Sequence, residues 1–476
     1  MKPVRVRFAP SPTGYLHIGG LRTALYDYLF ARNQGGRMIL RIEDTDRNRL
    51  VEDATPKLIR ALETMDIRID EGPAVGGEFG PYVQSERLDI YHEQADRLLE
   101  AGHAYHCFCS SETLTQMRED QQAKGEFVKY DRRCLKLSAP DIKSKLESGV
   151  PHVLRLKMPD DHRFVFDDLI RGRVEMDSSQ SDDQVILKSD GFPTYHLAAV
   201  VDDHFMQISH VIRGEEWLSS TPKHIWLYNC LGWDAPEWVH LPLILNKDRS
   251  KLSKRMNDVS VESYLEKGYL KEALINFIAL LGWHGADDRE LYSLDELCRE
   301  FSLDRVSKSG AVFDLTKLDW MNGMYIRSLP PETILERVKS YFLAQGIDLQ
   351  NDSRTCRMIS VARERVTLLP EIVDYCRMFY HKLPLSESDQ DTLGSDNSQK
   401  VLNYLQSILE HNYPQTDEEV DHIVKATGED LQIKGKQLYL PIRLALIRQP
   451  HGPDIAGIFM ILGQDEIMER LREAIQ

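Results

Sequence analysis

The chain has 476 residues, which exceeds the size at which one hydrophobic core stops growing, so we expect two to four domains. Its composition, 42% hydrophobic and 28% charged with 28 Gly and 21 Pro, excludes disordered, collagenous and low-complexity proteins. No apolar stretch approaches the roughly 20 residues that a membrane helix requires. Residues 1–5 lack the pattern of a signal peptide, and we expect a soluble, cytoplasmic protein.

The charge balance limits how this chain can contact nucleic acid. Its 59 Lys and Arg residues against 75 Asp and Glu residues give a formal net charge of −16, so the overall field repels polyanions and any RNA contact must be local. The 7 cysteines are an odd number spread over a long chain, which fits reduced thiols or a metal site better than a disulfide framework.

The first forty residues predict a strand, a helix and a second strand. Val4, Val6 and Phe8 alternate with arginines, as in a strand, and the prolines and glycine of residues 10–14 end it. Apolar residues at 21, 24, 25, 28 and 29 have the spacing of an amphipathic helix that begins near 16–20, and residues 38–42 predict the second strand. This order is typical of a parallel, doubly wound sheet with a right-handed crossover.

The next segment has a different character. Ser85 is a candidate N-cap for a helix that ends by Gly102. Residues 103–193 then combine cysteines, a charged helix near 117–124 and short strands such as 153–156. We interpret this stretch as an insertion into the sheet domain.

Strand and helix signals return after the insertion. Residues 210–213 predict a strand, and a helix follows Thr221, where the next residue is a proline suited to the first helical turn. Beyond about residue 260 the pattern is helical, with no convincing strand, and residues 383–397 are the strongest candidate for a break.

We therefore predict a Rossmann-like α/β doubly wound, parallel-sheet catalytic domain with an inserted α+β domain, followed by all-α C-terminal domains. The expected boundaries are 1–87 and 194–245 for the two halves of the sheet domain, 88–193 for the insertion, 246–330 for a following domain, and 331–476 for helical domains with a subdivision near 385.

Residues 13–20, TGYLHIGG, join the first strand to the first helix. A helix N-terminus offers backbone N–H groups and the positive end of the helix dipole, which suit an anionic phosphate. Gly19 and Gly20 would let a nucleotide approach the backbone, and His17 could donate to a phosphate or ribose oxygen. A glycine turn beside a histidine also occurs for purely structural reasons, so the motif alone leaves both alternatives open.

A basic segment, KLSKR at residues 251–255, follows the apolar run 241–245. Three cations in five residues can neutralise a triphosphate, and an ammonium group aimed at a developing pentavalent phosphate lowers the barrier. Alone, such a segment is usually a solvated loop. Because both segments lie at the edges of one predicted sheet, together they favour a nucleotide site.

These two segments resemble the paired signatures of class I aminoacyl-tRNA synthetases. Four blocks are similar to the bacterial glutamyl-tRNA synthetase family: RFAPSPTG at 7–14, RIEDTD at 41–46, GFPTYH at 191–196 and HVIRGEEW at 210–217. The resemblance continues more weakly through 281–283 into the C-terminal helices. It departs from the family where the first signature ends in Gly20 rather than a second histidine, and where His196 stands in place of the Asn of many relatives.

The resemblance implies a ligase that uses ATP and Mg²⁺ to activate glutamate to glutamyl-adenylate and transfers it to the 3′-terminal adenosine of tRNA(Glu). It implies attack through the 2′-hydroxyl and a requirement for bound tRNA. Catalysis would come from His17 and Lys254, through positioning and stabilisation of phosphate charge. The ATP-binding residues it implies are Thr13, Gly14, His17, Gly19, Gly20, Glu216, Trp217, Leu245, Lys251, Ser253, Lys254 and Arg255. The glutamate-binding residues it implies are Arg7, Ala9, Ser11, Glu43, Tyr195 and Arg213.

The chemistry of glutamate agrees with this set. By resemblance Arg7, Ser11 and Arg213 would hold carboxylates, while Glu43 and Tyr195 would hold the ammonium group. A guanidinium forms a planar, bidentate pair with a carboxylate that the amide of glutamine cannot satisfy equally, which favours the acid. The structural alternative for Arg7 and Glu43 is a strand-end salt bridge without a catalytic role.

Three cysteines and a tyrosine form a third candidate site. Cys107 and Cys109 can share a metal only on a tight turn, and Cys134 returns after a short excursion, which gives three ligands for tetrahedral Zn²⁺. With Tyr130 as an unusual fourth ligand, the pattern resembles the zinc site of some glutamyl-tRNA synthetases and of their shortened tRNA-modifying paralogue. The alternative donors are His103 and His106. Three small buried thiols without a metal are the structural alternative.

The resemblance assigns the insertion to the acceptor stem of tRNA, 246–330 to further stem contacts and 331–476 to the anticodon. Arginines and aromatic side chains of the C-terminal helices could stack the unpaired bases of an anticodon loop, although a charged helix face would look the same. These positions are Arg357, Arg363, Arg365, Arg443, Arg448, Tyr375, Phe379 and Tyr380.

The partners expected from the resemblance are glutamate, ATP and tRNA(Glu), with tRNA(Gln) as a further substrate of a non-discriminating or duplicated enzyme, and the family suggests a monomer. Two other functions compete. The tRNA-modifying paralogue lacks an anticodon domain, and a non-catalytic RNA-binding paralogue would be expected to have lost His17, Glu43 or Lys254. This chain retains all three residues and a long helical C-terminal part.

Overall fold

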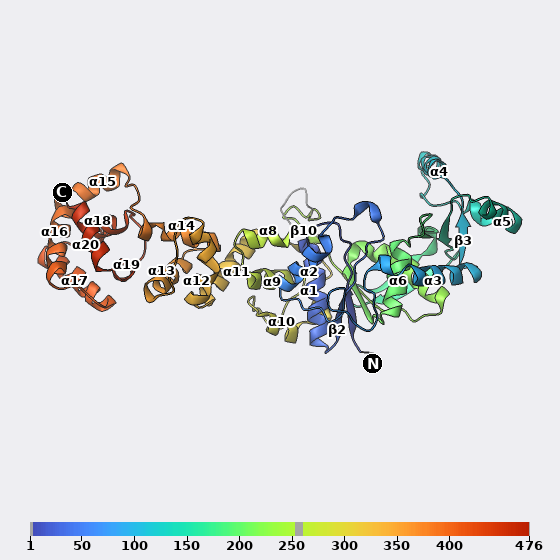
Figure 1. Ribbon diagram of the computed structural model, residues 1–476, viewed down its shortest axis with the longest axis horizontal. Coiled ribbons are helices and arrows are strands. Elements are labelled where there is room, and N and C mark those ends of the chain that lie inside the picture. Colours follow the sequence, from blue (N-terminus) through green and yellow to red (C-terminus); the bar gives the residue numbers. More distant parts are fainter. Residues whose placement is uncertain (1–2, 253–259, 476) are drawn as a thin grey trace. The chain divides into compact units, whose positions relative to one another are not determined.

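The computed structural model describes residues 3–252 and 260–475. It divides into two compact units, which are described separately (Figure 1). The first unit comprises Met1–Tyr264 with Leu274–Asp314, and the second comprises Leu265–Ala273 with Leu315–Gln476. In the described part of the chain, no helix combines the length and the apolar character needed to cross a membrane.

Two neighbouring sheets form the mainly parallel centre of the first unit: the pair β1–β2 and a four-stranded sheet in the order β6–β5–β9–β8. The strands β1 and β2, β8 and β9, and β9 and β5 pair in parallel, whereas β5 and β6 form an antiparallel hairpin. The Ser209 N–H donates to the Arg5 carbonyl at 2.9 Å and links β1 to the β8 edge. The bounds are β1 (Arg5–Phe8), β2 (Arg37–Leu40), β5 (Arg163–Asp168), β6 (Gly172–Asp177), β8 (His210–Gly214) and β9 (Glu237–Leu241).

Helices cover this sheet on both faces, with α1 on one side and α3 and α6 on the other (Figure 1). Helix α1 (Ile18–Asn33) packs on β1, β2 and β8. Helices α3 (Leu88–Glu100), α6 (Tyr195–Phe205) and α7 (Thr221–Leu231) share an apolar core with Ile39, Val211 and Trp238. The predicted α/β doubly wound, parallel-sheet domain is confirmed.

The first strand is buried along its whole length. All four residues of β1 are buried, including Arg5 and Arg7. The arginines can be buried because each meets a carboxylate: Arg5 Nη1 lies 2.8 Å from Glu71, and Arg7 Nε lies 3.0 Å from Asp203. Neither partner is near in sequence, so the pattern could not reveal them.

The predicted N-cap at Ser85 is wrong. Helix α3 begins at Leu88, and Ser85 lies in a single 3₁₀ turn, Gln84–Glu86, where its N–H donates to the Asp44 carboxylate at 2.8 Å. The helix after Thr221 is confirmed as α7, with Pro222 in its first turn.

The insertion carries its own antiparallel sheet in the order β3–β4–β7, and α4 and α5 lie beyond β3 (Figure 1). The predicted charged helix and the strand at 153–156 are confirmed. A small core joins Tyr105, Cys107, Met117, Tyr130 and Cys134. The bounds are β3 (Ala104–Cys107), α4 (Ser111–Ala123), α5 (Ala139–Glu147), β4 (Val153–Leu156) and β7 (Val185–Leu187).

One strand interrupts the region expected to be helical throughout. Strand β11 (Ala311–Val312) pairs in parallel with β10 (Ile244–Leu245), so the prediction of no strand beyond residue 260 is wrong. Two residues are too few for a periodic signal, and their pairing partner lies far away in sequence. The remaining helices up to this point are α2 (Ala54–Thr64), α8 (Val261–Glu266), α9 (Lys271–Ala279) and α10 (Leu294–Glu300).

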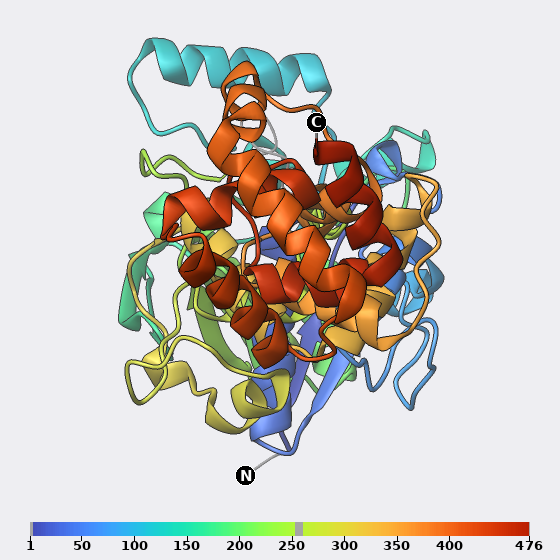
Figure 2. The same cartoon turned by 90° about the vertical axis from the view of Figure 1, so that its left-hand side faces the viewer.

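The second unit is built from helices, as predicted. These helices share one apolar core, and the orange to red ones are packed together in Figure 2. The break predicted at 383–397 holds a short helix, α15, whose N-cap Ser386 accepts from the Asp389 N–H at 3.2 Å. The helices are α11 (Leu315–Ser328), α12 (Pro331–Leu343), α13 (Ser353–Arg363), α14 (Leu369–Tyr380), α15 (Glu387–Gly394), α16 (Asp396–His411), α17 (Asp417–Asp430), α18 (Lys436–Ile447), α19 (Ile455–Leu462) and α20 (Gln464–Ala474).

Candidate active site

A cavity of about 780 Å³ lies where β1, β2 and β8 end, in the first unit. Ligands bind at this edge of open parallel sheets because the carboxyl ends of several strands converge there. Of the residues singled out in the sequence, the cavity is lined by Arg7, Ala9, Ser11, His17, Gly19, Gly20, Glu43, Tyr195, Arg213, Glu216, Trp217 and Lys251. Thr13, Gly14 and Leu245 are not among its lining residues, and Ser253, Lys254 and Arg255 lie outside the described residues.

Several residues that line the cavity were not predicted from the sequence: Arg22, Thr23, Thr45, Asp46, Asn48, Arg49, Lys188, Asp190 and Thr194. Thr45 and Asp46 belong to the RIEDTD block and Thr194 to the GFPTYH block, so a signal existed for them. Thr23 lies one helical turn beyond Gly19, and helix periodicity could have found it.

The N-terminus of α1 forms one wall of the cavity. His17 is its N-cap, and its Nδ1 accepts from the Gly19 N–H at 3.0 Å. A ring nitrogen that accepts carries no proton, so in the neutral ring the proton is on Nε2. The Gly19 N–H is therefore used by the cap and does not point at a phosphate, as was expected from the sequence. The same hydrogen bond orients the imidazole so that Nε2–H can donate.

The basic segment approaches the same cavity. Lys251 forms a β-bridge with Leu245, and its Nζ lies 3.9 Å from Glu216 Oε1. The Asn246 N–H donates to the Ser250 carbonyl at 2.8 Å and closes the turn that returns the chain. A cation and a helix N-terminus thus line the same cavity, which is an arrangement that attracts anions.

Buried ion pairs hold Arg7 and Glu43, which also line the cavity. Arg7 Nε and Arg41 Nη1 lie 3.0 Å and 2.7 Å from the same oxygen of Asp203, and Arg41 Nη2 lies 3.1 Å from Glu43. Burial alone would raise the pKa of Asp203, but Arg7 and Arg41 lower it below its ordinary value. Burial raises the pKa of Glu43 despite Arg41. A substrate ammonium group beside Glu43 would favour its ionised form.

Arg213 is 5% exposed at the end of β8 and lines the cavity. It donates to Tyr195 Oη (3.2 Å), His224 Nδ1 (3.2 Å), Thr221 Oγ1 (2.9 Å) and His240 Nε2 (3.0 Å). Burial lowers the pKa of His224 well below its ordinary value, so this partner is neutral. In residues 3–252 and 260–475 no carboxylate lies within 4.0 Å of this guanidinium, so its charge is available to an anionic ligand.

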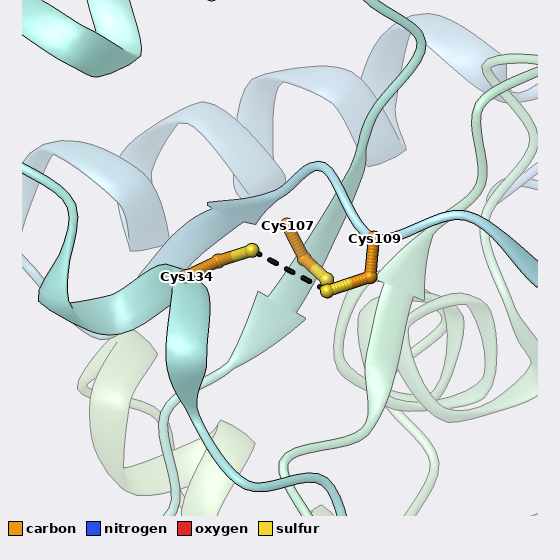
Figure 3. Close-up of side chains that lie close together, drawn as sticks. All are labelled: Cys107, Cys109 and Cys134. Atoms are coloured by element: carbon orange, nitrogen blue, oxygen red, sulfur yellow. Dashed lines mark hydrogen bonds between the residues drawn. The ribbon is translucent and has the colours of Figure 1, made fainter. Parts of the chain in front are cut away.

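The three cysteines of the insertion converge, and Figure 3 shows their side chains pointing toward one another. Their sulfur atoms all lie within 4.8 Å of each other, with Cys109 and Cys134 at 3.6 Å. Tyr130 Oη lies 3.3 Å from Cys107 and 3.4 Å from Cys109. Tetrahedral Zn²⁺ with Zn–S bonds of about 2.3 Å separates its sulfur ligands by about 3.8 Å. The donor set therefore fits zinc.

The alternative histidine donors lie elsewhere. Among the His, Cys, Asp and Glu side chains of the described residues, only the three cysteines bring ligand atoms together at this point. The His103 ring packs edge-on against Trp226, and the His106 ring packs against Phe108 and His152.

The cavity at a parallel-sheet edge, with a helix N-terminus and buried arginines in its lining, is typical of enzymes that bind a nucleotide and an anionic substrate. Two family models match the chain. "tRNA synthetases class I (E and Q), catalytic domain" covers residues 3–320, and "Anticodon binding domain" covers residues 333–475.

Comparison with individual relatives shows which class I aminoacyl-tRNA synthetases this chain is similar to. The chain is 43% identical to glutamate–tRNA ligase of Clostridioides difficile strain 630 over 98% of each chain, and 44% identical to that of Alkaliphilus metalliredigens strain QYMF over 99% of each. It is similar to the crystal structure of a glutamate tRNA ligase from Elizabethkingia meningosepticum in complex with its amino acid, with a TM-score of 0.94, 38% identity and coverage of 100% and 99%. The chain belongs to the bacterial glutamate–tRNA ligase family of class I aminoacyl-tRNA synthetases.

Proposed function

We propose that this protein is a glutamate–tRNA ligase, which forms glutamyl-adenylate from glutamate and ATP and transfers the glutamyl group to the 3′-terminal adenosine of tRNA(Glu). One observation carries the proposal: a single cavity is lined by the α1 N-terminus, Lys251 and the buried Arg7 and Arg213, within a chain of this family. Such a cavity can hold a nucleotide phosphate beside a dicarboxylate.

We propose that the phosphates of ATP lie against His17 and the α1 N-terminus, with Lys254 from the neighbouring basic segment. His17 Nε2–H and the Lys254 ammonium would stabilise charge that develops on the α-phosphate as the glutamate carboxylate attacks it. Asp46 and Glu216 line the cavity and offer oxygen ligands of the kind that Mg²⁺ prefers. Mg²⁺ held by these residues would neutralise part of the phosphate charge.

Glutamate binds, in this proposal, between Arg7 and Arg213 on its carboxylate sides and Glu43 and Tyr195 on its ammonium side. Arg213 is suited to this role because its described partners are neutral acceptors. Ser11, which lines the same cavity, adds a hydroxyl donor. No covalent enzyme intermediate is needed, because catalysis comes from positioning and from stabilising phosphate charge.

The insertion holds a structural Zn²⁺ through Cys107, Cys109, Cys134 and Tyr130 in this proposal. The metal would hold together the turn after β3 and the 3₁₀ turn at Arg133–Lys136, a small region that carries few apolar side chains. The insertion would then present a fixed surface to the acceptor stem of tRNA.

The remaining proposals concern the cellular location, the oligomeric state, the domain boundaries and the tRNA substrates. We place the protein in the cytoplasm as a monomer with the domain boundaries given above, and we propose tRNA(Gln) as a second substrate to be tested. Charging assays with radiolabelled glutamate and purified tRNA(Glu) and tRNA(Gln) transcripts test the function. Charging of tRNA(Glu) alone indicates a discriminating ligase, and charging of both indicates a relaxed one. Failure to charge either would overturn the proposal.

A further inference from the structure

Arg213 is held from behind by a chain of side chains from three neighbouring strands. In the parallel pair β8–β9, Arg213 stands directly opposite His240, and Asp168 lies at the end of β5 on the other side of β9. Arg213 Nε donates to His240 Nε2 at 3.0 Å, and His240 Nδ1 lies 2.6 Å from Asp168 Oδ2. The side chains of Asp168 and His240 have no exposed surface.

The partners of His240 determine its protonation. Arginine only donates, so the His240 Nε2 that faces Arg213 must accept, and the ring proton is on Nδ1. Thr221 Oγ1, which accepts from Arg213 Nη2, lies 3.2 Å from the same nitrogen. Burial lowers the pKa of His240 although Asp168 opposes it, so the ring is neutral.

Asp168 has the contacts needed to hold that tautomer. Its Oδ1 accepts from the N–H groups of Ile170 (3.0 Å) and Arg171 (2.8 Å), and its Oδ2 accepts from both the backbone N–H (3.1 Å) and the ring of His240. Burial alone would raise the pKa of Asp168, but these hydrogen bonds lower it. The carboxylate is therefore ionised and can only accept from His240 Nδ1.

We infer that Asp168 and His240 are positioning residues for Arg213: Asp168 fixes the Nδ1–H tautomer of His240, and the unprotonated Nε2 of that ring orients the guanidinium toward the substrate cavity. The inference rests on the proposed role of Arg213 in binding a carboxylate of glutamate. Asp168 acts on Arg213 only through the His240 ring. It therefore orients the guanidinium without forming an ion pair with it, and the positive charge of Arg213 stays available to a substrate carboxylate.

The variant Asp168→Asn changes the hydrogen bonding to His240 while keeping the size of the side chain. The two backbone donors at Oδ1 hold the amide oxygen there, so the amide NH₂ takes the place of Oδ2. It then donates to His240 Nδ1 and gives up the hydrogen bond from the His240 backbone N–H. The ring proton must then move to Nε2, where it faces the Arg213 Nε–H, and the guanidinium is displaced. In another carboxylate–histidine pair, the same Asp-to-Asn change traps the wrong tautomer while leaving the fold intact.

The tautomer is measured first, by ¹⁵N NMR of protein labelled on histidine, with His240→Gln used to identify the His240 signals. We expect a neutral ring protonated on Nδ1 in the wild-type protein and on Nε2 in Asp168→Asn. Protonation on Nε2 in the wild-type protein would overturn the inference. This measurement needs no activity, so it is independent of the proposed function.

Kinetics test the consequence. We expect Asp168→Asn to raise the KM for glutamate about 10- to 100-fold, as expected for a misplaced hydrogen bond to a charged group, while the KM for ATP changes less than about twofold. His240→Gln, whose amide oxygen can still accept from Arg213, should raise the KM for glutamate less than His240→Leu does. Glu71→Gln is the matched control, because Glu71 is an equally buried carboxylate that binds Arg5 away from the cavity.

The outcomes separate the two proposals. Wild-type protein that charges no tRNA with glutamate contradicts the proposed function. Active wild-type protein with an unchanged glutamate KM in Asp168→Asn, or with glutamate and ATP KM values that rise equally, contradicts the positioning role. Equal losses in His240→Gln and His240→Leu would also contradict it, because the acceptor would then have no effect.

Discussion

Replacing Asp203 with Asn should show how strongly the buried charge network supports both the fold and the cavity. The Asp203 side chain is 6% exposed, and its Arg7 and Arg41 partners are 5% and 0% exposed. Removing one member of such a buried set leaves the remaining charges uncompensated, which costs about 3–5 kcal/mol. We expect the free energy of unfolding of the first unit to fall by about that amount, and the KM for glutamate to rise about tenfold or more as Arg7 loses its orientation.

Urea unfolding at pH 7.5 and charging kinetics measure these effects. The control is Glu175→Gln, whose partners Arg163 and Arg173 are 70% and 68% exposed, and whose loss should cost less than about 1 kcal/mol. Because the folded-state pKa of Asp203 is lowered, its stabilisation is present above its unfolded pKa of about 3.9 and is lost as the pH falls through the folded pKa. If Asp203→Asn lowers the free energy of unfolding by less than about 1 kcal/mol and leaves the KM for glutamate unchanged, the reasoning is refuted.

Three further predictions test separate parts of the site. Lys254→Ala should abolish most adenylate formation, measured as tRNA-dependent ATP–pyrophosphate exchange, without changing the melting temperature; near-wild-type exchange would exclude its role. Cys109→Ser should lose the bound zinc measured by elemental analysis of the purified protein, whereas Cys230→Ser should keep it, and equal metal content in both would exclude the site. Glu43→Gln should raise the KM for glutamate about 10- to 100-fold because an ionic hydrogen bond to the ammonium group is lost, and an unchanged value would remove Glu43 from that role.

Several elements were predictable because their signals are local. The helix α1 and the strands β1 and β2 follow from hydrophobic spacing, and the turn between them follows from its prolines and glycine. The short strand β11 and the helix α15 were missed, because a two-residue strand carries no period and a serine-rich segment suggests a loop as readily as a capped helix.

The sequence by itself determined the opening order of strand, helix and strand, the glycine and histidine segment at a helix start, the basic segment downstream and the three thiols at ligand spacing, since each depends on residues close together in the chain. Only the tertiary structure decided that Arg7 is buried against Asp203 and that Arg213 is held by His240 and Asp168. These partners come from strands and helices far apart in sequence, and parallel pairing brings their ends to one sheet edge. Burial at that edge makes each charge depend on a partner, so the same contacts that stabilise the fold also orient the side chains of the cavity.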